Sequence, residues 1–292
     1  MRSAPAACKS CGSARVRRRY ALQAFDVWAC DTCTIYFRHP LPDAAELVAM
    51  YENPRYHESA YFQNAGRGYR RDAPEVRIYQ RALADLAGLT TPGRLLDVGC
   101  GAGVFLDLAR ERGWNVVGIE LSERHATHAR TTFGLDVRRS DFLEADLPAA
   151  SFAAVTMWDF LEHVLDPRAV LARARRLLAP GGVLLVFTID SSSFFNGTAD
   201  VLYRASAGRA VRPLELLYDA RHNYYFTKPS LERLLGGSGF QVERWRSDRA
   251  YLGRWLSEPA PGYLVAGGMV IDVLSFTVGR PYRRTAFCRS IR

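Results

Sequence analysis

The central part of the chain alternates between two patterns of apolar positions, one typical of buried strands and one typical of helices. Residues 95–98 form a short run that is apolar apart from Asp97, as expected for a parallel strand that is covered on both faces. Apolar side chains then recur at helical spacing at Val104, Leu106 and Leu108, and a second apolar run follows at 116–119. This order predicts a β-α-β unit and therefore an α/β fold.

Similar patterns continue towards the C-terminal end. Residues 152–157 read as a fourth strand, 239–245 as a sixth and 285–291 as a short seventh. Between the last two lies a strongly apolar stretch, 263–278, which only Asp272 interrupts. This stretch is slightly short for a membrane span, and no transmembrane span is expected. We expect a buried helix, with a membrane-facing helix and peripheral membrane contact as the alternative.

Four of the six cysteines indicate a separate unit near the N-terminus. Cys8 and Cys11 form one C-x2-C pair, and Cys30 and Cys33 form a second pair after eighteen intervening residues. This spacing is typical of a zinc ribbon, in which two tight turns direct four thiolates at one structural Zn²⁺ ion. The intervening residues 16–28 read as a short hairpin.

A unit of about 40 residues cannot bury enough apolar surface to fold alone, and metal binding would supply the missing stability. The first cysteine pair is not preceded by an apolar leader, so we expect a cytoplasmic protein with reduced thiols. Two disulfides are the alternative to zinc.

The stretch that follows the first central strand carries the candidate chemistry. It contains Gly99, Gly101 and Gly103, preceded by Asp97, and alternating glycines let a backbone approach a ligand closely. A dinucleotide-binding turn would instead read G-x-G-x-x-G and face a pyrophosphate, which a carboxylate would repel. Asp97 suits an ammonium or sulfonium group, and Glu120 at the end of the second strand suits a ribose diol.

These features resemble the signature of the class I S-adenosylmethionine-dependent methyltransferases over residues 94–190. The first motif of that family matches residues 96–103, and residues 177–186 match its later helix-turn-strand segment. The resemblance implies a doubly wound, Rossmann-like sheet of seven strands, with S-adenosylmethionine bound across the carboxyl ends of the strands. It also implies that Asp141 contacts adenine and that Phe142 covers an adenine face. The cofactor-binding residues that we expect are Asp97, Gly99, Cys100, Gly101, Gly103, Glu120, Leu121, Asp141, Phe142 and Trp158.

The flanking segments resemble the nucleotide-sugar C-methyltransferases and their unassigned bacterial relatives. The likeness rests on the ribbon followed by residues 37–42, and larger members of that group also carry a Tyr-His-Glu-His stretch that supplies a catalytic base. The nearest stretch here is 219–227, where His222 and Phe226 match while the Tyr and the Glu are absent. His222 is therefore our first candidate for a general base. The alternative is that it packs the loop and caps the helix that begins near 229.

The segment after the fourth strand suggests a second mechanism. Asp159, Glu162 and His163 resemble the Glu-x-x-Glu-His set with which ubiquinone-type O-methyltransferases can hold a divalent cation. Such a cation would lower the pKa of a bound phenol. His163 is thus a second catalytic candidate, and the alternative is a helix-start and pocket residue that holds no metal.

A formal net charge of +9, carried almost entirely by arginine, raises the expectation of an acidic partner such as a nucleic acid. A coding bias towards arginine would give the same composition. The run 15–20 is the best argument for RNA, although alternate residues of a strand point to opposite faces. Four further arginines could hold a substrate phosphate or carboxylate. They are Arg204, Arg209, Arg212 and Arg221.

We therefore expect a zinc ribbon at 1–40, a helical linker and lid at 41–90, and a methyltransferase core at 91–292 with a substrate-side insert at 191–221. The expected activity is methyl transfer to a small molecule, such as a sugar, a glycan precursor or a secondary metabolite. The alternatives are an RNA methyltransferase, a metal-assisted phenol O-methyltransferase, and a scaffold without turnover.

Overall fold

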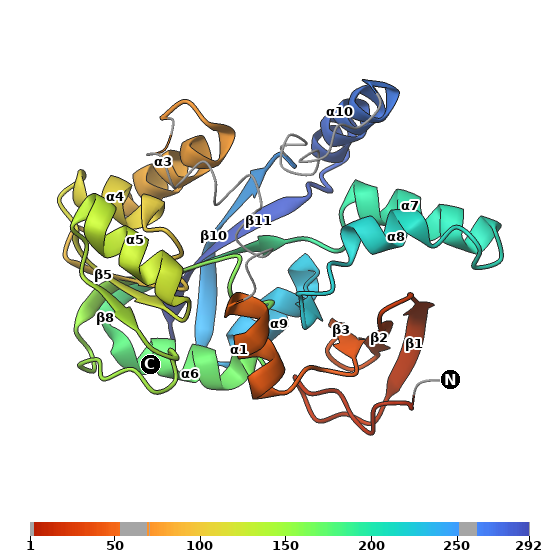
Figure 1. Cartoon of the computed structure of the whole chain (residues 1–292), viewed down its shortest axis with the longest axis horizontal. Helices are drawn as coiled ribbons and strands as arrows, with labels where there is room; N and C mark the ends of the chain where they lie inside the picture. Colours follow the sequence, from red (N-terminus) through yellow and green to blue (C-terminus); the bar gives the residue numbers. More distant parts are fainter. Residues whose placement is uncertain (1–2, 53–68, 70, 251–261, 292) are drawn as a thin grey trace.

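The computed structural model describes residues 3–52, 69, 71–250 and 262–291, and these contain two β-sheets (Figure 1). The larger sheet has seven strands. They are β4 (Arg94–Val98), β5 (Asn115–Glu120), β6 (Val137–Arg139), β7 (Phe152–Trp158), β8 (Leu178–Ile189), β10 (Phe240–Asp248) and β11 (Arg283–Ser290).

The strand order of this sheet is β10-β11-β8-β7-β4-β5-β6. β6, β5, β4, β7 and β8 are parallel, whereas β11 runs antiparallel to both of its neighbours. The order reverses between β4 and β7, and in open α/β sheets such a reversal is where ligands bind. The predicted doubly wound sheet of seven strands is confirmed.

Helices cover both faces of the larger sheet. They are α3 (Pro74–Ala87), α4 (Val104–Arg110), α5 (Glu123–Phe133), α6 (Pro167–Leu177) and α9 (Lys228–Gly237). Leu95 belongs to the buried cluster that includes residues of α3, α4 and α5, whereas Leu96 belongs to the cluster that includes residues of α6 and α9. Successive strand residues point to opposite faces, so each continuous apolar run serves both layers.

The smaller sheet combines N-terminal strands with a strand from a distant part of the chain. Its members are β1 (Val16–Ala21), β2 (Asp26–Cys30), β3 (Tyr36–His39) and β9 (Tyr224–Tyr225), in that order. β1 and β2 form the predicted hairpin, and helix α1 (Ala44–Glu52) follows β3. The sequence pattern does not predict β9, which pairs antiparallel with β3.

The insert expected at 191–221 contains helices α7 (Phe194–Ala205) and α8 (Arg212–Leu217). Figure 1 shows both beside the smaller sheet, and a buried cluster joins Tyr20 and Phe25 of the ribbon segment to Leu214 and Tyr218. The insert therefore packs against the ribbon.

Helix α10 (Gly262–Thr277) corrects one expectation. The prediction that this apolar stretch is a buried helix is wrong for residues 267–278, because Met269 and Val270 are each 60% exposed. The helix lies against α7, and the buried carboxylate of Asp272 accepts a hydrogen bond from the Ala250 amide. Among residues 267–277 only Asp272 and Ser275 are buried, so most apolar side chains of this part of the helix are exposed. Within the described ranges, no helix is long and apolar enough to cross a membrane.

Candidate active site

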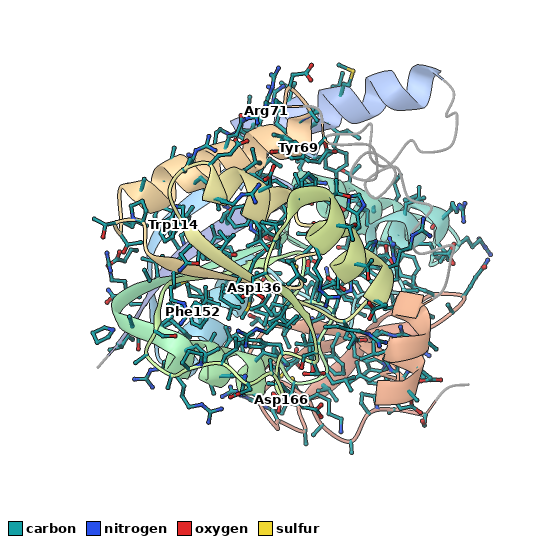
Figure 2. All side chains as sticks on the ribbon, turned by 60° about the vertical axis from the view of Figure 1, so that its left-hand side comes forward. Tyr69, Arg71, Trp114, Asp136, Phe152 and Asp166 are labelled. Atoms are coloured by element: carbon teal, nitrogen blue, oxygen red, sulfur yellow. The ribbon has the colours of Figure 1, made fainter. Side chains whose placement is uncertain are left out.

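The residues expected to bind a cofactor lie along the edge where the parallel strands of the larger sheet end. Asp97 is the penultimate residue of β4, and Glu120 is the last residue of β5. Figure 2 labels Trp114, Asp136 and Phe152, which lie where β5, β6 and β7 begin and therefore mark the opposite edge. The candidate site is thus confined to the carboxyl edge of the sheet.

The glycine turn between β4 and α4 requires glycine for two physical reasons. Gly99, Gly101 and Gly103 have φ angles of 72°, 54° and 87°, in the left-handed region that side chains disfavour. A Cβ atom added to Gly99 would lie 2.6 Å from Cδ2 of Phe160, and one added to Gly103 would lie 2.7 Å from Cδ1 of Leu135. The turn is therefore tightly packed against its neighbours.

Two buried carboxylates flank this turn. Thr156 donates a hydrogen bond of 2.6 Å to Asp97, which is 2% exposed. Burial raises the pKa of Asp97 to about 8 and the charge of Glu120 adds to this, although the hydrogen bond from Thr156 opposes it. Glu120 accepts 2.8 Å hydrogen bonds from the Gly101 and Ser122 amides, and burial nevertheless raises its pKa. A cationic ligand beside Asp97 would favour its charged form.

The two residues expected at the adenine ring have different surroundings. Asp141 is exposed, and its carboxylate accepts a hydrogen bond of 2.6 Å from the Leu143 amide. Phe142 is buried, and its ring meets that of Phe160 edge-on, with 6.4 Å between centroids. The guanidinium of Arg173 lies 5.6 Å from the centre of the Phe142 ring. Phe142 thus belongs to a packed cluster beside the glycine turn.

Trp158 lies at the end of β7 in an aromatic cluster. Its ring centroid is 4.7 Å from that of Tyr79, 5.0 Å from that of Phe105 and 5.1 Å from that of Phe187. The side chain is 8% exposed and faces the layer of α3 and α4. The role of Trp158 in cofactor binding stays a prediction.

Cys100 and Leu121 complete the expected cofactor set. Cys100 is buried, which raises the pKa of its thiol well above the ordinary value. A Cβ atom added to Gly118 would lie 2.6 Å from its Sγ atom, so the thiol packs against β5. Leu121 is half-buried directly after Glu120, and its carbonyl accepts a hydrogen bond from Arg139.

The two histidines named as catalytic candidates lie together. The ring centroids of His163 and His222 are 4.6 Å apart, with 86° between the ring planes. Nδ1 of His163 is 3.0 Å from the carbonyl oxygen of Arg221, and a carbonyl only accepts, so Nδ1 carries the proton. Burial and the neighbouring His222 lower the pKa of His163 to about 3. His163 is therefore neutral at pH 7, with a lone pair on Nε2.

The histidine pair borders the glycine turn through one short segment. Phe160, which limits the space at Gly99, accepts a hydrogen bond of 3.0 Å from the His163 amide through its carbonyl. Glu162 lies between them in sequence, is 1% exposed and accepts a hydrogen bond of 2.8 Å from Thr188. The segment 159–163 therefore connects the expected cofactor site to the histidines.

A possible cation site differs from the one that the sequence suggested. The ligand atoms of Glu162, His163 and His222 all lie within 4.8 Å of one another. Asp159, which the sequence pattern includes, is not part of this group among the residues that the structure describes. His222 from a distant loop takes the third place.

Asn223 is a site residue that sequence reasoning missed. It is fully buried, and its side-chain amide donates a hydrogen bond of 2.7 Å to the carbonyl of His163. Its backbone amide donates a second hydrogen bond, of 2.8 Å, to the carbonyl of Glu162. Its place directly after His222 was the only available signal. The helix that follows is capped by Thr227 and not by His222, so the alternative role of His222 as a cap is wrong.

The four N-terminal cysteines form one cluster. The Sγ atoms of Cys8 and Cys33 are 3.7 Å apart, those of Cys11 and Cys30 are 3.6 Å apart, and all four lie within 4.8 Å of one another. A disulfide would bring two sulfurs to about 2.05 Å. Four sulfurs placed tetrahedrally at about 2.3 Å from Zn²⁺ would be roughly 3.8 Å apart. The donor set and its spacing fit a four-coordinate metal ion.

Several arginines that suggested binding of a nucleic acid or of a substrate phosphate or carboxylate lie close to acidic side chains of this chain. Three in the ribbon hairpin do so: the pairs are Arg17–Asp31 at 3.0 Å, Arg18–Asp26 at 3.7 Å and Arg19–Asp200 at 3.4 Å. Three in the insert do likewise: the pairs are Arg204–Asp200, Arg212–Glu215 and Arg221–Asp219. These six arginines are therefore paired within the chain.

Comparison with known families agrees with this geometry. Residues 69–244, more than half of the chain, match the family described as a methyltransferase domain. The chain therefore belongs to this family of class I S-adenosylmethionine-dependent methyltransferases. The match includes the glycine turn, both buried carboxylates and the histidine pair.

Individual relatives cover only parts of the chain. It is 41% identical over 106 residues to a ubiquinone biosynthesis O-methyltransferase of Hahella chejuensis, which is 34% of this chain and 44% of that protein. It is 30% identical over 167 residues to a probable S-adenosylmethionine-dependent methyltransferase of Mycolicibacterium smegmatis, which is 57% of each. The chain thus spans about half the length of the curated relatives it matches.

Among solved structures, geranyl diphosphate C-methyltransferase from Streptomyces coelicolor A3(2) superposes with a TM-score of 0.56 at 14% identity. The superposition covers 86% of this chain and all of that one. At this identity the likeness concerns the fold alone.

Proposed function

We propose that the chain transfers the methyl group of S-adenosylmethionine to an oxygen or carbon atom of a small molecule, with His222 as the general base. The observation that carries this proposal is the histidine pair, with centroids 4.6 Å apart, joined by segment 159–163 to the glycine turn at Gly99. A base beside a methyl-donor site is the arrangement that such a reaction needs.

The buried carboxylates fit the two polar parts of S-adenosylmethionine. Asp97 has a raised pKa because no bulk water solvates its charge, and an ammonium or sulfonium group would compensate for that. Both oxygens of Glu120 already accept one backbone hydrogen bond, but each has a second lone pair that can accept from a ribose hydroxyl. Asp97 would hold the cationic end and Glu120 the ribose.

When bound, S-adenosylmethionine supplies a methyl group on a sulfonium, whose C–S bond breaks as the bond to the acceptor forms. The residues of this chain then mainly position the acceptor and receive its proton. A pKa of about 3 makes His163 a weak base, so we assign proton removal to His222 and orientation to His163. Phe160 and Phe142 would exclude water from the glycine turn.

A small-molecule acceptor is favoured over RNA by the pairing of the arginines. An RNA-binding face needs arginines whose charges are available for phosphates. Here Arg17, Arg18 and Arg19 each engage an aspartate of this chain. RNA methylation is therefore the less favoured alternative.

Metal-assisted O-methylation is a second candidate, favoured by the proximity of Glu162, His163 and His222. A neutral imidazole and a carboxylate are suitable ligands for several divalent ions. A cation held by these residues would lower the pKa of a bound phenol.

We infer further that the four N-terminal cysteines bind one structural Zn²⁺ ion. Their sulfur spacing fits a tetrahedral set, in which all four coordination positions are filled by protein. Such an ion stabilises the ribbon and does not take part in the reaction.

The experiment that tests the proposed activity uses S-adenosylmethionine labelled in its methyl group. The protein is incubated separately with a nucleotide-sugar and metabolite extract, a phenol pool and total RNA, and Asp97→Ala serves as the control. We expect label in a small-molecule fraction with the unchanged protein only. Label in RNA would overturn the proposal, and label in the phenol pool that depends on added divalent cation would favour the second candidate.

A further inference from the structure

The segment that carries His222 continues directly into a strand of the ribbon sheet. Strand β9 pairs with the ribbon strand β3, so that Tyr224 lies opposite Phe37 and Tyr225 lies opposite Tyr36. The pairing places a cysteine-containing unit from the start of the chain beside the expected catalytic loop. About 190 residues of sequence separate the two strands.

Arg38 of the ribbon extends this contact to both sides of His222. Its backbone amide donates a hydrogen bond of 3.0 Å to the carbonyl of Asn223. Its guanidinium donates to the carbonyls of Ala220 and Pro40, the latter at 3.2 Å. One ribbon residue therefore holds the chain two residues before His222 and one residue after it.

The opposite side of the same segment is held by the methyltransferase core. The amides of Asn223 and Tyr224 donate to the carbonyl of Glu162, at 2.8 and 3.0 Å. The carbonyl of Phe226 accepts a hydrogen bond of 2.7 Å from the Ser191 amide. His222 is thus carried on a short segment that lies between the ribbon and the turn that holds His163.

The side chains of β9 pack into two different clusters. Tyr224 belongs to the buried cluster that contains Cys8 and Phe37, and its hydroxyl donates a hydrogen bond of 2.9 Å to the carbonyl of Leu165. Tyr225 points the other way, where its ring stacks on Phe25 at 6.4 Å. The cysteine cluster and the segment after His222 therefore share one hydrophobic core.

We propose that the four-cysteine ribbon is the positioning element for His222, and that Arg38 is the positioning residue through which it acts. This inference rests on the proposed role of His222. A strand of two residues has too few hydrogen bonds to hold its own place, so β9 depends on β3. β3 in turn begins three residues after Cys33, next to the cysteine cluster. Loss of the cluster should release His222 while the cofactor residues of β4 and β5 stay in place.

The test measures hydrogen exchange in the full-length protein by mass spectrometry, with zinc bound, after chelation and after zinc is restored. We expect amides 222–226 to exchange about tenfold faster or more after chelation, and to regain protection with zinc. The dissociation constant of S-adenosylmethionine, measured on the same samples, should change by less than about threefold. Unchanged exchange at 222–226, while residues 8–33 lose protection, would overturn the proposal.

Arg38→Ala tests the proposal even if the chelated protein unfolds, because this variant keeps all four cysteines. Arg17→Ala is the matched control, since Arg17 is an exposed ribbon arginine that pairs with Asp31. Arg38→Ala, but not Arg17→Ala, should accelerate exchange at 222–226 and increase the rate at which diethyl pyrocarbonate modifies His222 at a fixed pH. Equal behaviour of the two variants would contradict a positioning role.

These readouts need no methyl acceptor, so the two proposals can fail separately. If His222→Ala keeps the full rate of methyl transfer, the proposed role of His222 fails whatever the exchange data show. If His222→Ala lowers the rate of methyl transfer, but hydrogen exchange at 222–226 is unchanged by chelation and by Arg38→Ala, the positioning proposal alone fails.

Discussion

Thr156 donates a hydrogen bond of 2.6 Å to Asp97 inside the sheet, at the point where β4 and β7 lie side by side. Apart from this bond, the surroundings of Asp97 favour its neutral form, because burial raises its pKa to about 8. The carboxyl group of Asp97 should therefore lose a proton when a cation binds beside it. We therefore expect cofactor binding beside Asp97 to depend on pH.

We expect binding of S-adenosylmethionine to release close to one proton near pH 7, since the cationic ligand favours the charged form of Asp97. Affinity should rise between about pH 6 and pH 8 and then level off. Titration calorimetry in buffers of different ionisation enthalpy measures the proton count. Asp97→Asn is the control and should lose both the proton release and about tenfold or more in affinity.

The same group gives a prediction for the unliganded protein. Because the folded state raises the pKa of Asp97, it holds a proton that the unfolded chain loses near pH 4. The contribution of Asp97 to the free energy of unfolding should therefore fall as pH rises from about 4 to about 8. Urea unfolding of the wild type and of Asp97→Asn across this range checks it. A difference between them that does not vary with pH would contradict the raised pKa.

Gly99→Ala should destabilise the protein by about 1–3 kcal/mol, because it combines a positive φ angle with a Cβ atom 2.6 Å from Phe160. The double variant Gly99→Ala, Phe160→Ala separates the two causes. It removes the clash and keeps the backbone strain, so the added cost of the alanine at 99 should be smaller in that background. Equal costs in both backgrounds would show that Phe160 does not limit the space.

His222→Ala should lower the rate of methyl transfer by about 10²–10⁴-fold while the affinity for S-adenosylmethionine stays within about threefold. The reason is that the proposed function assigns His222 to the acceptor and assigns cofactor binding to the carboxylates of Asp97 and Glu120. His128→Ala, a change on α5 away from the histidine pair, is the control. A wild-type rate in His222→Ala would exclude it as the base.

Purified protein should contain about one zinc ion per chain, and Cys30→Ser should lose it. Cys288→Ser should keep the metal, because Cys288 lies buried in β11 and outside the cysteine cluster. Metal analysis by mass spectrometry on both variants provides the measurement. Protein that is fully folded without any metal would refute a structural zinc site.

The parts of the site that could be predicted from the sequence are those that a local pattern encodes, and the glycine turn is an example. Asp97, Gly99 and Glu120 belong to one β-α-β unit, whose residue order fixes their place at the carboxyl edge of the sheet. No local sequence pattern predicts that β9 pairs with β3, because the two tyrosines of β9 pair with residues that are distant in the sequence. The contact between His163 and His222 likewise joins two segments about 60 residues apart, and no local pattern indicates it.

Helix α10 shows a different limit. Apolar residues such as Met269 and Val270 led us to expect a buried helix. Whether an apolar helix is buried depends, however, on whether the rest of the fold provides a surface that covers it. In the structure, residues 267–277 of α10 bury only Asp272 and Ser275. Trp158 is a related case. The sequence predicts that it lies at the end of β7, but its packing depends on the face of the sheet to which its side chain points, and this is the face covered by α3 and α4.

The most direct test of the central claim measures S-adenosylhomocysteine formed when RNase-treated, size-filtered metabolite extract is added to the protein with S-adenosylmethionine. We predict that product accumulates with the wild type and falls to background with Asp97→Ala, while His222→Ala binds the cofactor and turns over slowly. Product that appears only when intact RNA is added, or at equal rates in all three proteins, would contradict methyl transfer to a small molecule at this site.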